Sequence, residues 1–169
     1  MNSRNGTEQK QRLSLTLLLA AVYLILYSTL LSRTTAERSA AVLRPFALLV
    51  SAIWEKREIF RSLLLNILLF EPFGAALACS LSHEISIGKR VFIAATVGLA
   101  FSLMVEYGQY RFSLGNAETD DVICNTLGAG IGALALCVNH IWQASNIRKV
   151  NRAPNREHDK GEYDVGKTV

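Results

Sequence analysis

Carboxylate and carboxamide side chains interrupt the apolar segments of this sequence at a few positions. Carboxylates accept hydrogen bonds, hold divalent cations and, in pairs, serve as general acid and base, whereas carboxamides orient the hydroxyl and amide groups of a ligand. Ionisable groups at membrane depth are costly, so they usually face the interior of a helix bundle or a wet cavity. The candidate ligand-binding residues are therefore Asn66, Glu106, Gln109, Asp120, Asp121 and Asn125.

These residues also have ordinary structural explanations. Asn66, Gln109 and Asn125 are suited to joining helices by hydrogen bonds. Asp120 or Asp121 is suited to capping a following helix, because an acidic residue at a helix N-terminus accepts hydrogen bonds from exposed N–H groups. Both interpretations remain open for each residue taken singly.

The location of the polar residues favours a shared site. Asn66 is near the start of the second apolar segment, Glu106 is near the end of the third, and Asp121 is at the start of the fourth. In an antiparallel bundle these three places lie at one membrane face. We therefore expect the six side chains to gather there.

Small residues at helical spacing lead towards the polar positions. Two sets each share one helix face: Ala94, Gly98, Ser102 and Glu106, and Asp121, Asn125, Gly128 and Gly132. Gly128 and Gly132 form a GxxxG pattern, which lets two helix backbones approach closely. We predict that the third and fourth segments pack tightly and bring their polar residues together.

Four apolar segments must position these residues, namely 13–31, 62–81, 91–110 and 122–142. Each is long enough to cross the hydrocarbon core of a bilayer as a helix. Of the 169 residues 50% are hydrophobic and 19% are charged, and the charged residues crowd between the segments. This distribution excludes a soluble enzyme, a nucleic-acid-binding domain and a disordered protein. It predicts an all-α integral membrane bundle of four transmembrane helices.

The flanking and connecting segments have their own character. Residues 1–12 form an N-terminal tail, residues 13–143 form the transmembrane domain, and residues 144–169 form a basic tail expected to be disordered. The apolar segment 42–54 is too short to cross a membrane, so it is expected to be interfacial or re-entrant.

The basic residues orient the bundle. With four spans, 11 of the 18 Lys and Arg residues lie on the side of both termini, which predicts cytoplasmic termini. Cys79, Cys124 and Cys137 all lie in apolar segments, and their odd number and spacing match neither a disulfide framework nor a metal motif. No metal or other cofactor is expected.

Two motifs resemble the signatures of the VanZ-like family. The first is residues 66–74 (NILLFEPFG), with Phe70, Pro72 and Gly74 after Asn66. The second comprises residues 106–109 (EYGQ) and 118–128 (ETDDVICNTLG). Arg44, Pro45 and Phe46 resemble a further Pro-Phe element of that family. The chain departs from the family pattern at Asn116, where many members carry Arg, and at Glu71, which is usually apolar.

The resemblance implies a multi-pass protein of the bacterial cell membrane from a family associated with low-level resistance to the glycopeptide teicoplanin. The leading hypothesis is that a polar pocket at the outer face engages a lipid-linked envelope precursor or a lipoglycopeptide. One alternative is an intramembrane metal-dependent hydrolase or transferase acting on a lipid phosphate. Another is a non-catalytic membrane adaptor. Membrane lipids are expected partners, and nucleic acids are not.

Overall fold

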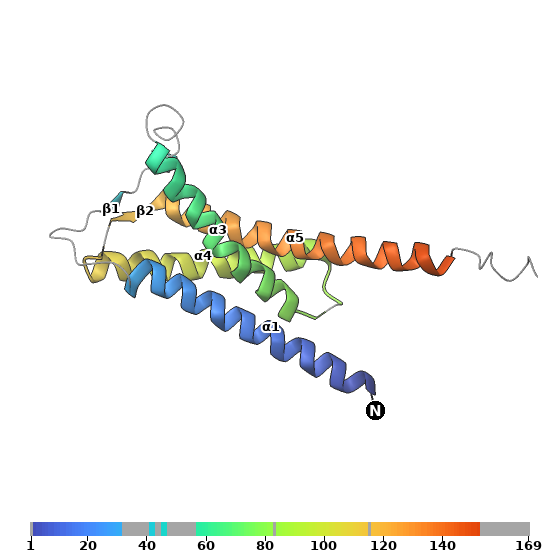
Figure 1. The fold of residues 1–169 in the computed structure, drawn as a ribbon. Coiled ribbons are helices and arrows are strands. Elements are labelled where there is room, and N and C mark those ends of the chain that lie inside the picture. Colours follow the sequence, from blue (N-terminus) through green and yellow to red (C-terminus); the bar gives the residue numbers. More distant parts are fainter. Residues whose placement is uncertain are drawn as a thin grey trace, which may run out of the picture. The chain divides into compact units, whose positions relative to one another are not determined.

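The computed structural model describes residues 2–31, 41–42, 45–46, 57–82, 84–114 and 116–152. The elements are α1 (Asn2–Leu26), a π-helical turn that extends it (Tyr27–Leu31), β1 (Ala41–Val42), α3 (Arg57–Ser80), α4 (Ile87–Arg111), β2 (Ala117–Glu118) and α5 (Thr119–Arg152) (Figure 1).

Each of the four helices contains a segment long and apolar enough to cross a membrane. These segments are Gln11–Leu31, Phe60–Ser80, Ile87–Arg111 and Thr119–Arg148. Large apolar side chains such as Leu19, Phe92 and Met104 are 70% exposed or more, which suits contact with lipid. The predicted all-α membrane bundle is confirmed, and the protein is a multi-pass membrane protein.

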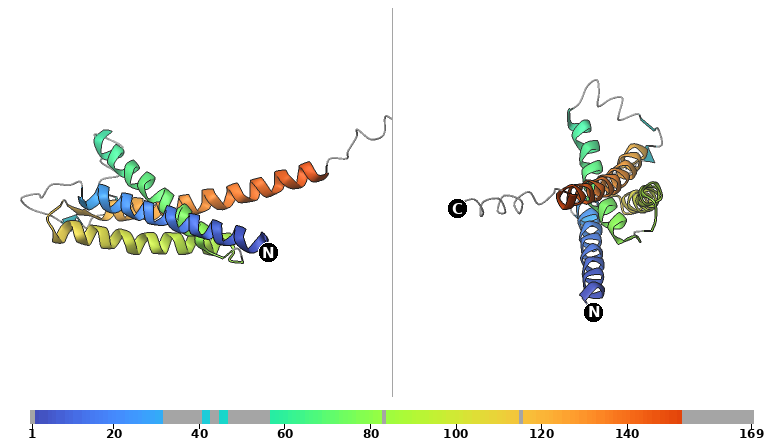
Figure 2. Two further views of the ribbon diagram at one scale, coloured as in Figure 1. Left: turned by 60° about the horizontal axis from the view of Figure 1, so that its bottom comes forward. Right: turned by 90° about the vertical axis from the view of Figure 1, so that its right-hand side faces the viewer.

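The helices of the bundle alternate in direction. Figure 2 shows α1 and α4 running one way and α3 running the other, and α3 packs against both of them. The end of α4 therefore lies at the same end of the bundle as the start of α3.

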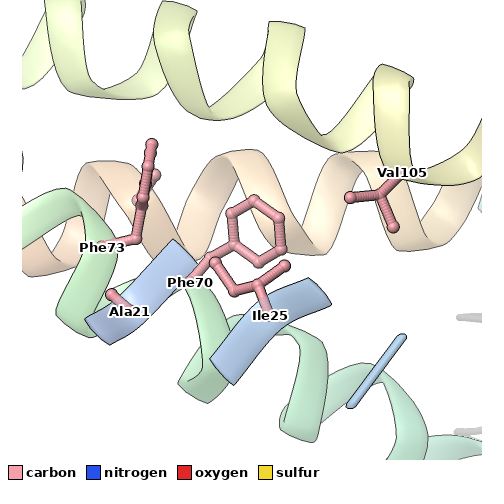
Figure 3. Close-up of a cluster of buried hydrophobic side chains, with 6 residues drawn as sticks. Ala21, Ile25, Phe70, Phe73 and Val105 are labelled. Carbon is pink, nitrogen blue, oxygen red and sulfur yellow. The ribbon is translucent and has the colours of Figure 1, made fainter. Parts of the chain in front are cut away.

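Aromatic residues of α3 form the centre of the apolar core. Phe70 is fully buried and lies among Ile25, Phe73 and Val105 (Figure 3). The rings of Phe73 and Phe101 stack with centroids 5.5 Å apart, which joins α3 to α4. Phe70 of the first motif is thus a packing residue.

Three glycines let α3 and α5 approach at backbone distance. A Cβ atom on Gly128 would lie 2.2 Å from the carbonyl oxygen of Ile67, and one on Gly132 would lie 1.9 Å from that of Glu71. From the other helix, a Cβ on Gly74 would lie 1.9 Å from the carbonyl oxygen of Ala129. We predicted that the GxxxG pair packs on the third span, which is α4. This is wrong, because both glycines face the backbone of α3, the second span.

The contact between α4 and α5 uses a different stripe of small residues. Ser102 of α4 contacts Asn125 of α5, and a Cβ atom on Gly98 would meet the Cβ of Ala129 at 2.6 Å. One turn further along, Ala94 and Ala133 are buried in one cluster. The predicted tight packing of α4 and α5 is therefore present. On α5 it uses Ala129 and Ala133, each one position after a glycine of the GxxxG pair.

A short parallel strand pair links the segment after α1 to the start of α5. Ala41 pairs with Ala117, and Val42 pairs with Glu118. The sequence did not predict these strands, because two residues carry no periodic pattern. Of the predicted interfacial segment 42–54, the structure describes Val42 in β1 and Pro45 and Phe46 in a turn. Its other residues lie outside the described part.

The helix α5 continues past residue 144, where we expected a disordered tail to begin. It ends at Arg152, beyond the compact unit formed by residues 1–137. Ala144, Arg148 and Lys149 favour the helical state, and basic residues near a helix C-terminus complement its dipole. Residues 153–169 lie outside the described part of the chain.

Candidate functional site

The C-terminus of α4 ends in a Schellman motif. The N–H of Leu114 donates to the carbonyl of Gln109 at 2.9 Å, and the N–H of Ser113 donates to that of Tyr110 at 3.4 Å. Ser113 has φ 55°, the left-handed conformation that this motif requires and that glycine usually supplies. The turn directs the chain from α4 into β2.

Glu106 binds the edge of β2. Its side chain is 6% exposed, and its Oε2 accepts a hydrogen bond from the backbone N–H of Glu118, with 3.0 Å between the nitrogen and the oxygen. The carboxylate thus occupies the place of a carbonyl oxygen on a further strand. Strand β2 is held by β1 and by this carboxylate.

Asn125 joins α5 to α4 in the interior of the bundle. Its Nδ2 donates to Oγ of Ser102 at 2.8 Å, and the side chain is 2% exposed. Asp121, which is 9% exposed, lies one turn before Asn125, as Glu106 lies one turn after Ser102. The antiparallel register of this contact places Asp121 opposite Glu106.

Gln109 joins the end of α4 to the end of α1. Its Nε2 donates to the carbonyl of Thr29 at 3.2 Å, and its side chain is 1% exposed. Thr29 belongs to the π-helical turn, and its own Oγ1 donates to the carbonyl of Ile25 at 2.6 Å. Single π-helical turns are frequent at functional sites.

Asp120 binds the turn at Pro45 and Phe46. Its Oδ1 accepts a hydrogen bond from the backbone N–H of Phe46, at 2.5 Å. Phe46 has φ 63°, which is unusual for a bulky residue and persists only where the surroundings fix it. The side chain of Asp120 is 4% exposed, so its carboxyl group is buried at this contact.

Asn66 stands apart from the other predicted site residues. It is half-buried, and its side chain hydrogen-bonds to none of the described residues. The backbone of the adjacent Ile67 is the part of α3 that Gly128 contacts, so Asn66 lies beside the first turns of α5. The structure brings the other five residues to the end of the bundle where α4 ends and α5 begins.

We call the buried polar residues of α4 and α5 at this end the polar cluster. It consists of Ser102, Glu106, Gln109, Asp120, Asp121 and Asn125. Two of its oxygen atoms, Oε1 of Gln109 and Oδ1 of Asn125, are buried and have no hydrogen-bond partner among the residues that the structure describes. Among the described residues, no group of three or more His, Cys, Asp and Glu side chains has an arrangement that could hold a metal ion. The cluster is therefore rich in hydrogen-bond acceptors and retains unused acceptor capacity.

Sequence reasoning missed several hydrogen-bond partners of the predicted site residues, among them Ser102 and the carbonyl of Thr29. Ser102 was recognised only as a small packing residue, although a hydroxyl one turn before Glu106 on the same face was a signal for a polar contact. The carbonyl of Thr29 is 80 positions from Gln109 and carries no signal in the sequence, because any residue has a carbonyl group.

Comparison with known proteins adds the family. The model of the VanZ/LLP1 family matches residues 14–142, which include all four predicted spans but for the first residue of one. No curated protein and no solved structure gave a match. The matched range contains the whole polar cluster and the close contact between α3 and α5. The chain belongs to the VanZ/LLP1 family.

Proposed function

We propose that this protein binds the polar part of a cell-envelope amphiphile, a lipid-linked precursor or a lipoglycopeptide, at the polar cluster. The apolar chain of such a ligand would lie along the exposed apolar surface of the spans. Through this binding the protein would contribute to resistance to teicoplanin. The protein would lie in a bacterial cell membrane, with the polar cluster at the outer face of that membrane.

The observation that carries the proposal is the pair of unpartnered carboxamide oxygens. Gln109 and Asn125 are 1% and 2% exposed. Each donates through its amide nitrogen, while its oxygen has no donor in the described part of the chain. Leaving a buried acceptor unsatisfied costs about 1–3 kcal/mol. A ligand that supplies N–H or O–H groups would recover this free energy, which favours a binding role over a purely structural one.

The composition of the cluster indicates what kind of headgroup it favours. Glu106, Asp120 and Asp121 contribute carboxyl oxygens, so the cluster presents acceptors and negative charge. Sugar hydroxyls, peptide amides and ammonium groups are complementary to such a surface. A bare lipid phosphate is not, because it is itself an anionic acceptor. Phosphate-directed enzymatic chemistry is therefore the weaker alternative.

The proposed orientation of the protein in the membrane rests on the distribution of its basic residues. Most Lys and Arg residues, 11 of 18, lie on the side of the two termini, which favours a cytoplasmic location for that side. The end of α4 and the start of α5 are at the opposite side. The polar cluster would then face the compartment in which envelope precursors and glycopeptides are encountered.

The test uses a strain that expresses wild-type protein, the Glu106→Gln variant or an empty vector. Glutamine retains an oxygen that accepts from Glu118 but removes the charge. We expect wild type to raise the teicoplanin concentration that inhibits growth and Glu106→Gln to raise it less, at matched amounts of protein in the membrane. Equal sensitivity of all three strains would overturn the resistance part of the proposal.

A further inference from the structure

Glu71 is an ionisable residue near the middle of a membrane-spanning segment. The span of α3 runs from Phe60 to Ser80, so Glu71 lies about 15 Å along the helix axis from either end. Its side chain is half-buried and hydrogen-bonds to none of the described residues. A carboxyl group at this depth is costly, because lipid chains offer no hydrogen bonds. A polar partner from outside the described part of the chain would lower this cost.

The packing of α5 on α3 fixes the position of Glu71. A Cβ atom on Gly132 would lie 1.9 Å from the carbonyl oxygen of Glu71, so the two helices are in backbone contact at this residue. Phe70 and Phe73 of the same helix belong to the apolar core. Helix α3 therefore cannot rotate to move the carboxyl group to another face without breaking both contacts.

Exposed apolar residues continue the face of α3 on which Glu71 lies. Phe60, Leu64 and Leu68 are 55%, 41% and 50% exposed. The steps from Phe60 to Leu64, to Leu68 and to Glu71 are four, four and three residues, which places all four on one helix face. We call these four residues the α3 stripe. Alternating steps of four and three are typical of the seam between two parallel helices, where a single polar residue specifies the pairing.

The Lys and Arg residues of the described spans lie at or near the span ends. They are Arg12, Arg61, Lys89, Arg90, Arg111 and Arg148. Even Arg61, on α3 itself, precedes Glu71 by ten residues, or about 15 Å along the helix axis. No cation of the described spans therefore lies at the depth of Glu71.

A second copy of the chain supplies a polar group at this depth. Copies of a multi-pass protein share one orientation in the membrane, so a two-fold axis that relates two of them runs along the membrane normal. Each residue then has its counterpart at the same depth. Two α3 helices in contact along the stripe bring their Glu71 carboxyl groups together. Two carboxyl groups that share a proton hydrogen-bond to each other.

We propose that the protein forms a dimer in the membrane through the α3 stripe, with the Glu71 carboxyl groups of the two copies hydrogen-bonded to each other. Glu71 is not part of the polar cluster, so this pairing does not depend on the binding of an envelope amphiphile.

Energy transfer between donor-labelled and acceptor-labelled full-length protein in liposomes tests the proposal. Its dependence on the ratio of protein to lipid gives an association constant. We expect wild type to dimerise and Glu71→Leu to lower the association constant about tenfold, because a polar contact between helices is lost. Glu71→Gln should associate nearly as wild type does, because a carboxamide both donates and accepts hydrogen bonds.

Two leucine variants form a matched pair for the same measurement. Leu68 in the α3 stripe and Leu103 on α4 are 50% and 53% exposed. Leu68→Ala should weaken association, and Leu103→Ala should leave it unchanged.

Cysteine cross-linking locates the contact in a variant without its three native cysteines. Leu64→Cys should form a disulfide-linked dimer on oxidation in the membrane, and Leu103→Cys should not. Monomeric wild type at every ratio of protein to lipid would overturn the proposal. So would equal association of wild type and Glu71→Leu, or equal cross-linking at positions 64 and 103.

Discussion

The side-chain amide of Asn125 donates a 2.8 Å hydrogen bond to the hydroxyl of Ser102, in the buried contact between α5 and α4. The same stripe continues through Gly98 against Ala129, so small residues bring the two helices close enough for this polar contact. The arrangement fixes the amide nitrogen of Asn125 and leaves its oxygen without a donor from any described residue. The polar cluster is therefore positioned by packing and is not saturated by internal hydrogen bonds.

Removing the Ser102 hydroxyl should destabilise the protein. Ser102→Ala leaves the amide nitrogen of Asn125 without an acceptor at a buried position, which should lower the free energy of unfolding by about 1–2 kcal/mol. Unfolding in mixed micelles with increasing dodecyl sulfate measures this change. The control is Thr126→Val, because the Thr126 hydroxyl donates to the carbonyl of Val122 on its own helix and joins no second helix among the described residues. An equal effect of both variants would contradict the role assigned to Ser102.

The contact between α5 and α3 should not tolerate a methyl group at its closest points. Gly132→Ala places a Cβ 1.9 Å from the carbonyl oxygen of Glu71, so the helices must separate, and we expect a loss of about 3 kcal/mol or more. Gly130→Ala is the matched control, because its new Cβ would meet only the Cβ of Ala95 at 3.8 Å.

The same unfolding assay compares the two glycine variants. We expect Gly130→Ala to be as stable as wild type or up to about 1 kcal/mol more stable, because its Cβ makes an ordinary contact and alanine favours a helix interior more than glycine does. Similar stabilities of Gly130→Ala and Gly132→Ala would show that α5 does not pack on α3 through Gly132.

The hydrogen bond from Glu118 to Glu106 should control local opening of the connection between α4 and α5. Glu106→Ala removes the acceptor, so the Glu118 amide should exchange with deuterium about tenfold faster or more, in line with a lost hydrogen bond of about 1.4 kcal/mol. Glu106→Gln keeps an acceptor and should exchange nearly as slowly as wild type. Hydrogen exchange with mass spectrometry of peptides that cover residues 116–120 measures the difference. Unchanged exchange in Glu106→Ala would be incompatible with this hydrogen bond.

Glycine at position 113 should stabilise the end of α4. Ser113 adopts φ 55°, a left-handed conformation that costs a residue with a Cβ atom about 1 kcal/mol relative to glycine. Ser113→Gly should therefore raise the free energy of unfolding by about 0.5–1 kcal/mol. Ser145→Gly, within α5, provides the opposite control, because glycine in a helix interior is destabilising. A loss of stability in Ser113→Gly would contradict the Schellman motif.

The length and apolarity of the spans made most of the fold predictable. The predicted segments 13–31 and 62–81 agree with the spans of α1 and α3 to within two residues at either end. Helix termini were less predictable, because polar flanking residues such as Lys89 and Arg148 also form helix. The continuation of α5 to Arg152 is the largest such difference.

The choice of partner helix was the part that the sequence could not determine. Gly128 and Ala129 are neighbours, so both stripes of α5 are made of small residues, and spacing alone did not show that glycine faces α3 and alanine faces α4. The polar residues were predictable because they interrupt apolar runs. Their backbone partners, such as the N–H of Phe46, were not, since backbone groups have no signature in the sequence.

Binding of an envelope amphiphile to the polar cluster is measured most directly with the protein reconstituted in lipid nanodiscs and titrated with fluorescently labelled teicoplanin or a labelled lipid-linked precursor. We predict saturable binding of at least one of these ligands to wild type and affinity about tenfold weaker for Asn125→Leu, which removes an unpartnered carboxamide oxygen. Thr126→Val should bind as wild type does. Failure of wild type to bind either ligand, or equal affinity of wild type and Asn125→Leu, would contradict the proposed function.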